Sequence, residues 1–146
     1  MTAAAIDYGK STASARLQGA VEAAPKKILV ADDDKHMRVL LTHLLETRGY
    51  CVSSAAGGQE ALDQVPSFRP NLIVLDLELP DISGSEVCHR LKSESATENI
   101  PVLVVSGRPD IADQARISQA DGYLEKPFRL SELAKRVGLL CEAVSE

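Results

Sequence analysis

Four short apolar runs in this chain each lead into a polar residue that can take part in chemistry. The residues that follow or end these runs are the triplet Asp32-Asp33-Asp34, then Asp76, Ser106 and Lys126. Runs of this length are typical of strands buried on both faces of a parallel sheet. An open α/β sheet binds its ligands just beyond the carboxyl ends of its strands. We therefore expect the acids, the hydroxyl and the ammonium group to meet in one crevice.

From Lys27 onward, strand-like and helix-like segments alternate. The expected strands are 27–32, 50–53, 71–76, one that starts at Pro101, and 121–125. The expected helices are 35–48, one from Gly57-Gly58 to near Pro66, then 85–92, 111–119 and 130–143. Five βα units in a row predict an α/β fold, a doubly wound five-stranded parallel sheet with helices on both faces.

Apolar residues recur at helical spacing within the expected helices. The predicted inward-facing positions are Met37, Leu40, Leu41, Leu44, Leu45, Ala61, Leu62, Val65, Val87, Leu91, Leu133, Val137, Leu140 and Val144. Gly49 stands where a helix end favours a left-handed residue. Asp110 is expected to cap the helix over 111–119.

Length and composition limit the functional classes to which the chain can belong. The chain of 146 residues fits one domain, which we expect over 26–146, after a flexible or weakly helical arm over 1–25 that is rich in Ala, Ser, Thr and Gly. A net charge of −5 argues against direct nucleic-acid binding. We see neither a signal peptide nor an apolar run long enough for a membrane span, so we expect a cytoplasmic protein that does not bind membranes. Cys51, Cys88 and Cys141 are expected to be reduced thiols.

The acids predict a cation site. Asp32, Asp33 and Asp76 would stand close together, and packed carboxylates repel each other unless a cation intervenes. Mg²⁺ suits a site of one or two carboxylates with water and a phosphate oxygen. The alternative is a set of solvated acids that cap helices, and Asp34 fits that simpler role.

A carboxylate can also act as a nucleophile and form an aspartyl phosphate, which requires positive charge near the incoming phosphoryl group. Lys126 is placed to supply that charge, although alone it would read as a surface lysine. Ser106 can donate to a phosphoryl oxygen, and Gly107 leaves room for that oxygen; the alternative is an ordinary Ser-Gly loop. The histidines, which are His36, His43 and His89, lack metal-ligand spacing and are expected at or near the surface.

Four segments together resemble the receiver domain of two-component response regulators, in the CheY-like superfamily with its flavodoxin-like (βα)5 fold. They are ILVADDD at 28–34, LIVLDLELPDISG at 72–84, PVLVVSG at 101–107 and GYLEKPF at 122–128. Their order and the interval of 43 residues from Asp33 to Asp76 match the family. The resemblance covers about 27–143.

The resemblance implies a role for each matching residue. Asp76 corresponds to the phosphoacceptor and, with Asp33 and the backbone carbonyl of Glu78, to the Mg²⁺ ligands, whereas Asp32 would hold the metal through water. Lys126 matches the phosphate-binding lysine, Ser106 the switch hydroxyl, and Tyr123 the aromatic residue that swings inward after phosphorylation.

Three features depart from the family pattern. Ser106 stands where threonine is commoner, and Gln119 stands where a glycine often precedes alanine. The interval of 20 residues from Ser106 to Lys126 is short, so the helix after Ser106 is expected to be truncated or reoriented. We also hypothesise that Glu78 and Arg108 pair across the crevice mouth and lengthen the lifetime of the phosphate.

The resemblance implies a signalling switch rather than an enzyme with a separate substrate. The domain would assist its own Mg²⁺-dependent phosphorylation and dephosphorylation. Its partners would be a histidine kinase or a histidine phosphotransfer protein, an unknown downstream target, and a second copy through the fourth helix, fifth strand and fifth helix of the domain. We expect no output domain in this chain. The alternatives are a phosphorylation-independent interaction module and a hydrolytic phosphotransferase that uses an Asp nucleophile, of the haloacid-dehalogenase type.

Overall fold

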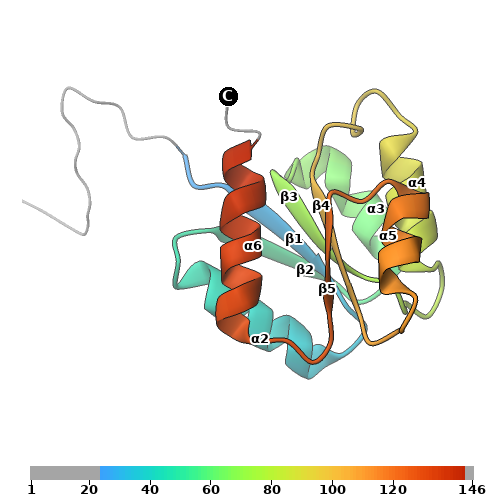
Figure 1. Ribbon diagram of the computed structural model, residues 1–146. Helices are drawn as coiled ribbons and strands as arrows, with labels where there is room; N and C mark the ends of the chain where they lie inside the picture. Colours follow the sequence, from blue (N-terminus) through green and yellow to red (C-terminus); the bar gives the residue numbers. More distant parts are fainter. Residues whose placement is uncertain (1–23, 144–146) are drawn as a thin grey trace, which may run out of the picture.

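A computed structural model describes residues 24–143 of the chain. Within that range, five strands form one parallel sheet in the order β2-β1-β3-β4-β5 (Figure 1). The strands are β1 (Lys27–Ala31), β2 (Cys51–Ala55), β3 (Leu72–Asp76), β4 (Val102–Ser106) and β5 (Gly122–Glu125). From β1 the chain adds β2 on one side, and it then adds β3, β4 and β5 on the other side. The carboxyl ends of β1 and β3 therefore flank the topological switch point, where sheets of this kind bind ligands.

Each strand is followed by a helix in the described range. The helices are α2 (Lys35–Glu46), α3 (Gly58–Phe68), α4 (Gly84–Lys92), α5 (Ile111–Ser118) and α6 (Leu130–Ala143). Helices α2 and α6 cover one face of the sheet, and α3, α4 and α5 cover the other (Figure 1). The predicted doubly wound five-stranded sheet is therefore confirmed.

The central strands are buried on both faces, as their apolar runs predicted. Alternate residues of a strand point to opposite faces. Leu29, Ile73 and Val104 join the core under α3, α4 and α5, whereas Ile28, Val74 and Leu103 join the core under α2 and α6. The central strands are packed on both faces, so the polar residues at their ends are attached to well-packed backbone.

Among the described residues, the predicted inward-facing positions are buried or half-buried, with Leu40 as the exception. Leu40 is 43% exposed, since the buried stripe of α2 runs through Leu41 and Leu45 instead. Helix α3 ends close to the predicted Pro66, at Phe68, and Arg69 then takes a left-handed conformation. The left-handed Gly49 after α2 is confirmed. Val144 and most of the predicted arm lie outside the described residues.

The prediction that the side chain of Asp110 caps α5 is wrong. Asp110 does occupy the N-cap position, but its side chain makes no capping hydrogen bond to the helix. Its carboxylate is instead bound by the guanidinium group of Arg108. At eight residues, α5 is the shortest helix of the described range.

Gln119→Gly should stabilise the protein, because Gln119 ends α5 with a φ of 67°. A side chain in this left-handed region costs about 1 kcal/mol or more. After the extra entropy of glycine in the unfolded chain, we expect a gain of about 0.5 kcal/mol in the free energy of unfolding. Urea unfolding measures this gain. Gln59→Gly, inside α3, makes the same chemical change and should lower stability; a loss in both variants would contradict the prediction.

Candidate functional site

The acids predicted to form a metal site do meet at the carboxyl ends of β1 and β3. Asp32 and Asp33 follow β1, and Asp76 is the last residue of β3. One carboxylate oxygen from each of the three lies within 4.8 Å of the others. Asp32 and Asp76 are buried, whereas Asp33 is exposed. The cluster therefore has two acids in the floor of the site and one at its opening.

Lys126 lies directly over this cluster, as predicted. Its Nζ is 3.0 Å from Oδ2 of Asp76 and 3.5 Å from Oδ2 of Asp32. Burial alone would lower the pKa of Lys126, but the hydrogen bond and charge of Asp76, together with the charge of Asp32, outweigh it and raise that pKa. The ammonium group is thus held in its charged form against the buried carboxylates.

Asp32 carries the clearest sign of a missing partner. Its Oδ1 accepts a hydrogen bond from the amide of Asp34 at 2.8 Å, but its buried Oδ2 has no hydrogen-bond partner. Burial raises the pKa of Asp32, and the neighbouring Asp76 carboxylate raises it further. A hard divalent cation would satisfy this oxygen and the charge around it. The residues of the site therefore fit Mg²⁺.

Asp32→Asn should stabilise the ligand-free chain at neutral pH by on the order of 1 kcal/mol, since it removes a charge that burial disfavours. A raised carboxyl pKa means that the folded state binds protons more readily than the unfolded state. The unfavourable contribution of Asp32 to the free energy of unfolding should therefore fade as the pH falls from neutral through the folded pKa toward the ordinary value of 3.8, so the stability gained by Asp32→Asn should shrink over the same range.

Urea unfolding with a chelator present, at neutral pH and at about pH 5, measures both effects of Asp32→Asn. Asp63→Asn, at an exposed position of α3, is the matched control. Added Mg²⁺ should stabilise the parent more than Asp32→Asn. A variant that is less stable than the parent at neutral pH without metal would contradict this account of Asp32.

The predicted switch residues Ser106 and Tyr123 lie on β4 and β5, and Ser106 ends the strand next to β3. Ser106 is fully buried, and its Oγ accepts a hydrogen bond from the amide of Arg108 at 3.0 Å. The backbone carbonyl of Ser106 accepts from the amide of Lys126 at 2.8 Å, which fixes the lysine next to β4. A Cβ added to Gly107 would meet only the Cβ of Lys126, at 4.0 Å, so the backbone there is open. Tyr123 is 42% exposed and points outward.

The predicted ion pair between Glu78 and Arg108 is not formed. The guanidinium group of Arg108 binds Asp110 instead, with Nε 2.8 Å from Oδ1 and NH2 2.9 Å from Oδ2. Asp110 is only two residues away in sequence, so this pairing costs little chain entropy. Glu78 is exposed, and its amide donates to Oδ1 of Asp76 at 2.9 Å. The negative charge of Glu78 raises the pKa of Arg108 less than the hydrogen bond and the charge of Asp110 do.

Two residues that support the site were not singled out from the sequence. Asp81 accepts hydrogen bonds from the amides of Gly58 and Gln59 at 2.8 and 3.0 Å, and so caps α3 from the loop after β3. These bonds, that from Gln59 first, lower the pKa of Asp81 to about 2. Gly84 packs against the backbone of Asp76 so closely that an added Cβ would overlap the Asp76 carbonyl oxygen.

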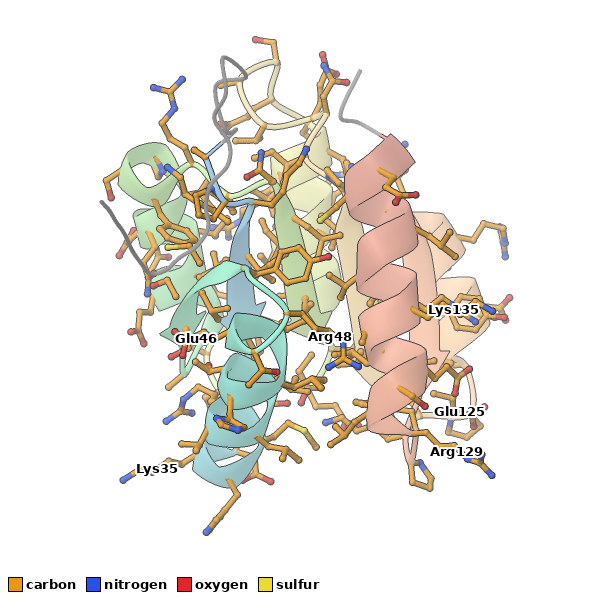
Figure 2. All side chains as sticks on the ribbon, turned by 90° about the vertical axis from the view of Figure 1, so that its left-hand side faces the viewer. Lys35, Glu46, Arg48, Glu125, Arg129 and Lys135 are labelled. Carbon is orange, nitrogen blue, oxygen red and sulfur yellow. The ribbon has the colours of Figure 1, made fainter. Side chains whose placement is uncertain are left out.

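The other residues considered from the sequence lie outside the cluster. Asp34 caps α2 by accepting from the amide of His36 at 2.9 Å, which confirms its simpler role. The three histidines are exposed, and the three cysteines are free. Figure 2 shows Lys35, Glu125 and Arg129 at one end of the molecule, around the start of α2 and the turn between β5 and α6. Among the described residues, no helix has the length and apolar character needed to cross a membrane.

Comparison with known proteins decides the family. The sequence model of the response regulator receiver domain matches residues 28–138, which include the acid site and the whole sheet and its helices apart from the first residue of β1 and the end of α6. This chain belongs to the response regulator receiver family. The predicted resemblance is thereby confirmed. Receiver domains are signalling domains that typically bind Mg²⁺ in an acidic pocket and interact with histidine kinases or phosphotransfer proteins, and the acid cluster of this receiver domain agrees with that description.

Individual relatives agree with the family. The receiver domain is 41% identical over 118 residues to the response regulator MprA of Mycolicibacterium vanbaalenii, a match that covers 80% of this chain and 50% of that protein. The chain thus spans about half the length of the curated relatives it matches. Among solved structures, a putative response regulator from Chloroflexus aurantiacus is 33% identical with a TM-score of 0.76, covering 81% of this chain and 98% of that one. CheY4 of Vibrio cholerae is 29% identical with a TM-score of 0.75, covering 80% and 98%.

Proposed function

We propose that this receiver domain is a phosphorylation-operated switch in which Asp76 accepts a phosphoryl group from a phosphohistidine of a kinase or a phosphotransfer protein. The observation that carries the proposal is the position of Lys126, whose ammonium group lies 3.0 Å from Oδ2 of Asp76 next to a cluster of acids. A cation in this position can neutralise charge on a phosphoryl group bound to Asp76.

The same proposal assigns a metal site. Asp33, Asp76 and the backbone carbonyl of Glu78 would hold Mg²⁺ directly, and Asp32 would hold it through water. When bound, the metal would supply positive charge to the phosphoryl oxygens. The buried Oδ2 of Asp32, which accepts no hydrogen bond, supports this assignment. Asp32 then serves to keep the local charge negative enough to attract the cation.

In the proposed transfer, a carboxylate oxygen of Asp76 attacks phosphorus in line with the bond to the histidine nitrogen. The O–P bond forms as the P–N bond breaks, and the electron pair of the broken bond returns to the imidazole nitrogen. Lys126 balances the charge that the phosphoryl oxygens bring into the site. Because Asp76 is already an anion, the step needs no general base.

The product would bias a two-state surface. The hydroxyl of Ser106 would turn toward the phosphoryl group, for which the open backbone at Gly107 leaves room, and Tyr123 would move into the space that the hydroxyl leaves. Its exposed position in this structure supports Tyr123 as the mobile partner. This change would alter the face made by α5, β5 and α6, which we propose as the surface for a downstream protein or for a second copy of the domain.

Mass spectrometry of the intact protein tests the proposal. After incubation with acetyl phosphate and Mg²⁺, the parent should gain one phosphoryl adduct, and Asp76→Asn should gain none. Asp63→Asn removes an exposed carboxylate from α3 and should be labelled like the parent. A parent that takes up no phosphoryl group would overturn the proposal and favour an interaction module that works without phosphorylation.

A further inference from the structure

The hydroxyl of Ser106 and the loop between β4 and α5 are tied together in this structure. Ser106 is fully buried, and its Oγ accepts the hydrogen bond from the amide of Arg108 at 3.0 Å. A buried polar group is costly without a partner. A hydroxyl that turned toward a phosphoryl group on Asp76 would leave this amide unless the loop followed. The position of Arg108 therefore bears on whether Ser106 can move.

Arg108 is held in place by Asp110. The guanidinium group and the carboxylate form two parallel hydrogen bonds, of 2.8 and 2.9 Å. This pairing raises the pKa of Arg108 and lowers that of Asp110. Asp110 stands at the N-cap position of α5, where its side chain would ordinarily accept a hydrogen bond from the helix backbone, yet it makes no such bond. The carboxylate thus accepts hydrogen bonds from side chains and none from the backbone amides of α5.

A second set of bonds leads from Asp110 to the neighbouring helix. Nε2 of Gln114, one turn into α5, donates to Oδ2 of Asp110 at 3.3 Å, and the hydroxyl of Ser85 in α4 donates to Oε1 of Gln114 at 2.9 Å. Ser85 follows Gly84, whose amide donates to the carbonyl of Leu77 directly after β3. The bonds thus run from the end of β4 through α5 and α4 back to the end of β3.

We propose that Arg108, Asp110, Gln114 and Ser85 form a latch that holds the β4–α5 loop in its ligand-free arrangement and lowers the affinity of the site for a phosphoryl group. The carboxylate of Asp110 accepts hydrogen bonds from two side chains, those of Arg108 and Gln114. If the loop followed the hydroxyl of Ser106, Asp110 would move relative to Gln114, which Ser85 holds against α4, and the bond between Asp110 and Gln114 would weaken. A ligand that binds after such a break gives up part of its binding free energy. This proposal rests on the proposed phosphorylation of Asp76.

Weakening the latch should tighten binding of a phosphoryl mimic. In the full chain, beryllofluoride with Mg²⁺ is titrated against amide NMR signals. Gln114→Met and Asp110→Asn should each lower the dissociation constant by roughly three- to tenfold, as expected for loss of a partly exposed polar bond. The matched control is Asp113→Asn, which removes a carboxylate of the same helix that pairs with Arg116 at 3.4 Å, outside the latch. Its dissociation constant should stay that of the parent.

A double variant tests whether the residues act as one unit. Ser85→Ala combined with Gln114→Met should change the affinity no more than Gln114→Met alone, because both break the same connection. Latch variants that bind beryllofluoride like Asp113→Asn, or more weakly, would overturn the latch while the proposed function stands. A parent that does not bind beryllofluoride would instead count against the proposed function.

The latch can also be tested without any ligand. Hydrogen exchange of the Arg108 amide in the ligand-free protein should be faster in Gln114→Met than in Asp113→Asn, because the loop opens more often once Asp110 is held from one side only. Equal exchange rates in these two variants would overturn the latch whatever the outcome with beryllofluoride.

Discussion

Lys126→Met should slow the Mg²⁺-dependent phosphorylation of Asp76 by acetyl phosphate by on the order of a hundredfold, the usual effect of removing one charged group that faces developing charge. The Nζ of Lys126 is 3.0 Å from Asp76 and 3.5 Å from Asp32. Methionine keeps the length and apolar character of the stem but removes the charge and the hydrogen-bond donors. The time course of the phosphoryl adduct, followed by intact mass, gives the rate.

Lys135→Met is the matched control for Lys126→Met. Lys135 is exposed on α6, and its side chain lies on the outer side of the helix (Figure 2). The substitution makes the same change in net charge away from the acids. Lys126→Met should also lower the free energy of unfolding of the ligand-free chain, since two buried carboxylates lose their cation. Equal labelling rates in Lys126→Met and Lys135→Met, with both proteins folded, would show that the ammonium group does not serve phosphoryl transfer.

The acid site could be predicted from sequence because it depends only on where strands end. Asp33, Asp76 and Lys126 follow apolar runs that read as buried parallel strands, and parallel strands present their carboxyl ends along one edge. No side-chain conformation has to be known to place such residues together. The same logic placed Ser106 correctly, since it ends β4.

Contacts made by loops could not be predicted in this way. Asp81 caps α3 from a loop more than twenty residues further along the chain, and no local pattern links the two. Arg108 had two acids within reach, and the choice of Asp110 over Glu78 depends on the shape of one turn. Leu40 has the spacing of a buried residue, but its exposure depends on how α2 is rotated against the sheet. These features depend on tertiary geometry rather than on periodicity.

Gly84→Ala should lower the free energy of unfolding by about 3–5 kcal/mol, which is large for the addition of one methyl group. Gly84 begins α4, and its amide donates to the carbonyl of Leu77 at 2.8 Å. A Cβ would overlap the carbonyl oxygen of Asp76 and lie 2.6 Å from the Cα of Leu77. Both obstacles are backbone atoms at the end of a buried strand, so neither can move aside as a side chain would.

Gly138→Ala makes the same chemical change with the opposite expected sign. Gly138 lies within α6, and an added Cβ would meet only the hydroxyl of Tyr50, at 4.0 Å. Alanine in a helix interior should therefore stabilise the protein by about 0.5–1 kcal/mol. Urea unfolding of both variants compares the two signs directly. Because the overlap at Gly84 falls on the backbone of Asp76 itself, any Gly84→Ala protein that still folds should also be labelled more slowly by acetyl phosphate, whereas Gly138→Ala should be labelled like the parent. A Gly84→Ala variant of parental stability would mean that α4 can move away from β3 at little cost, and that the packing under Asp76 does not hold the acceptor in place.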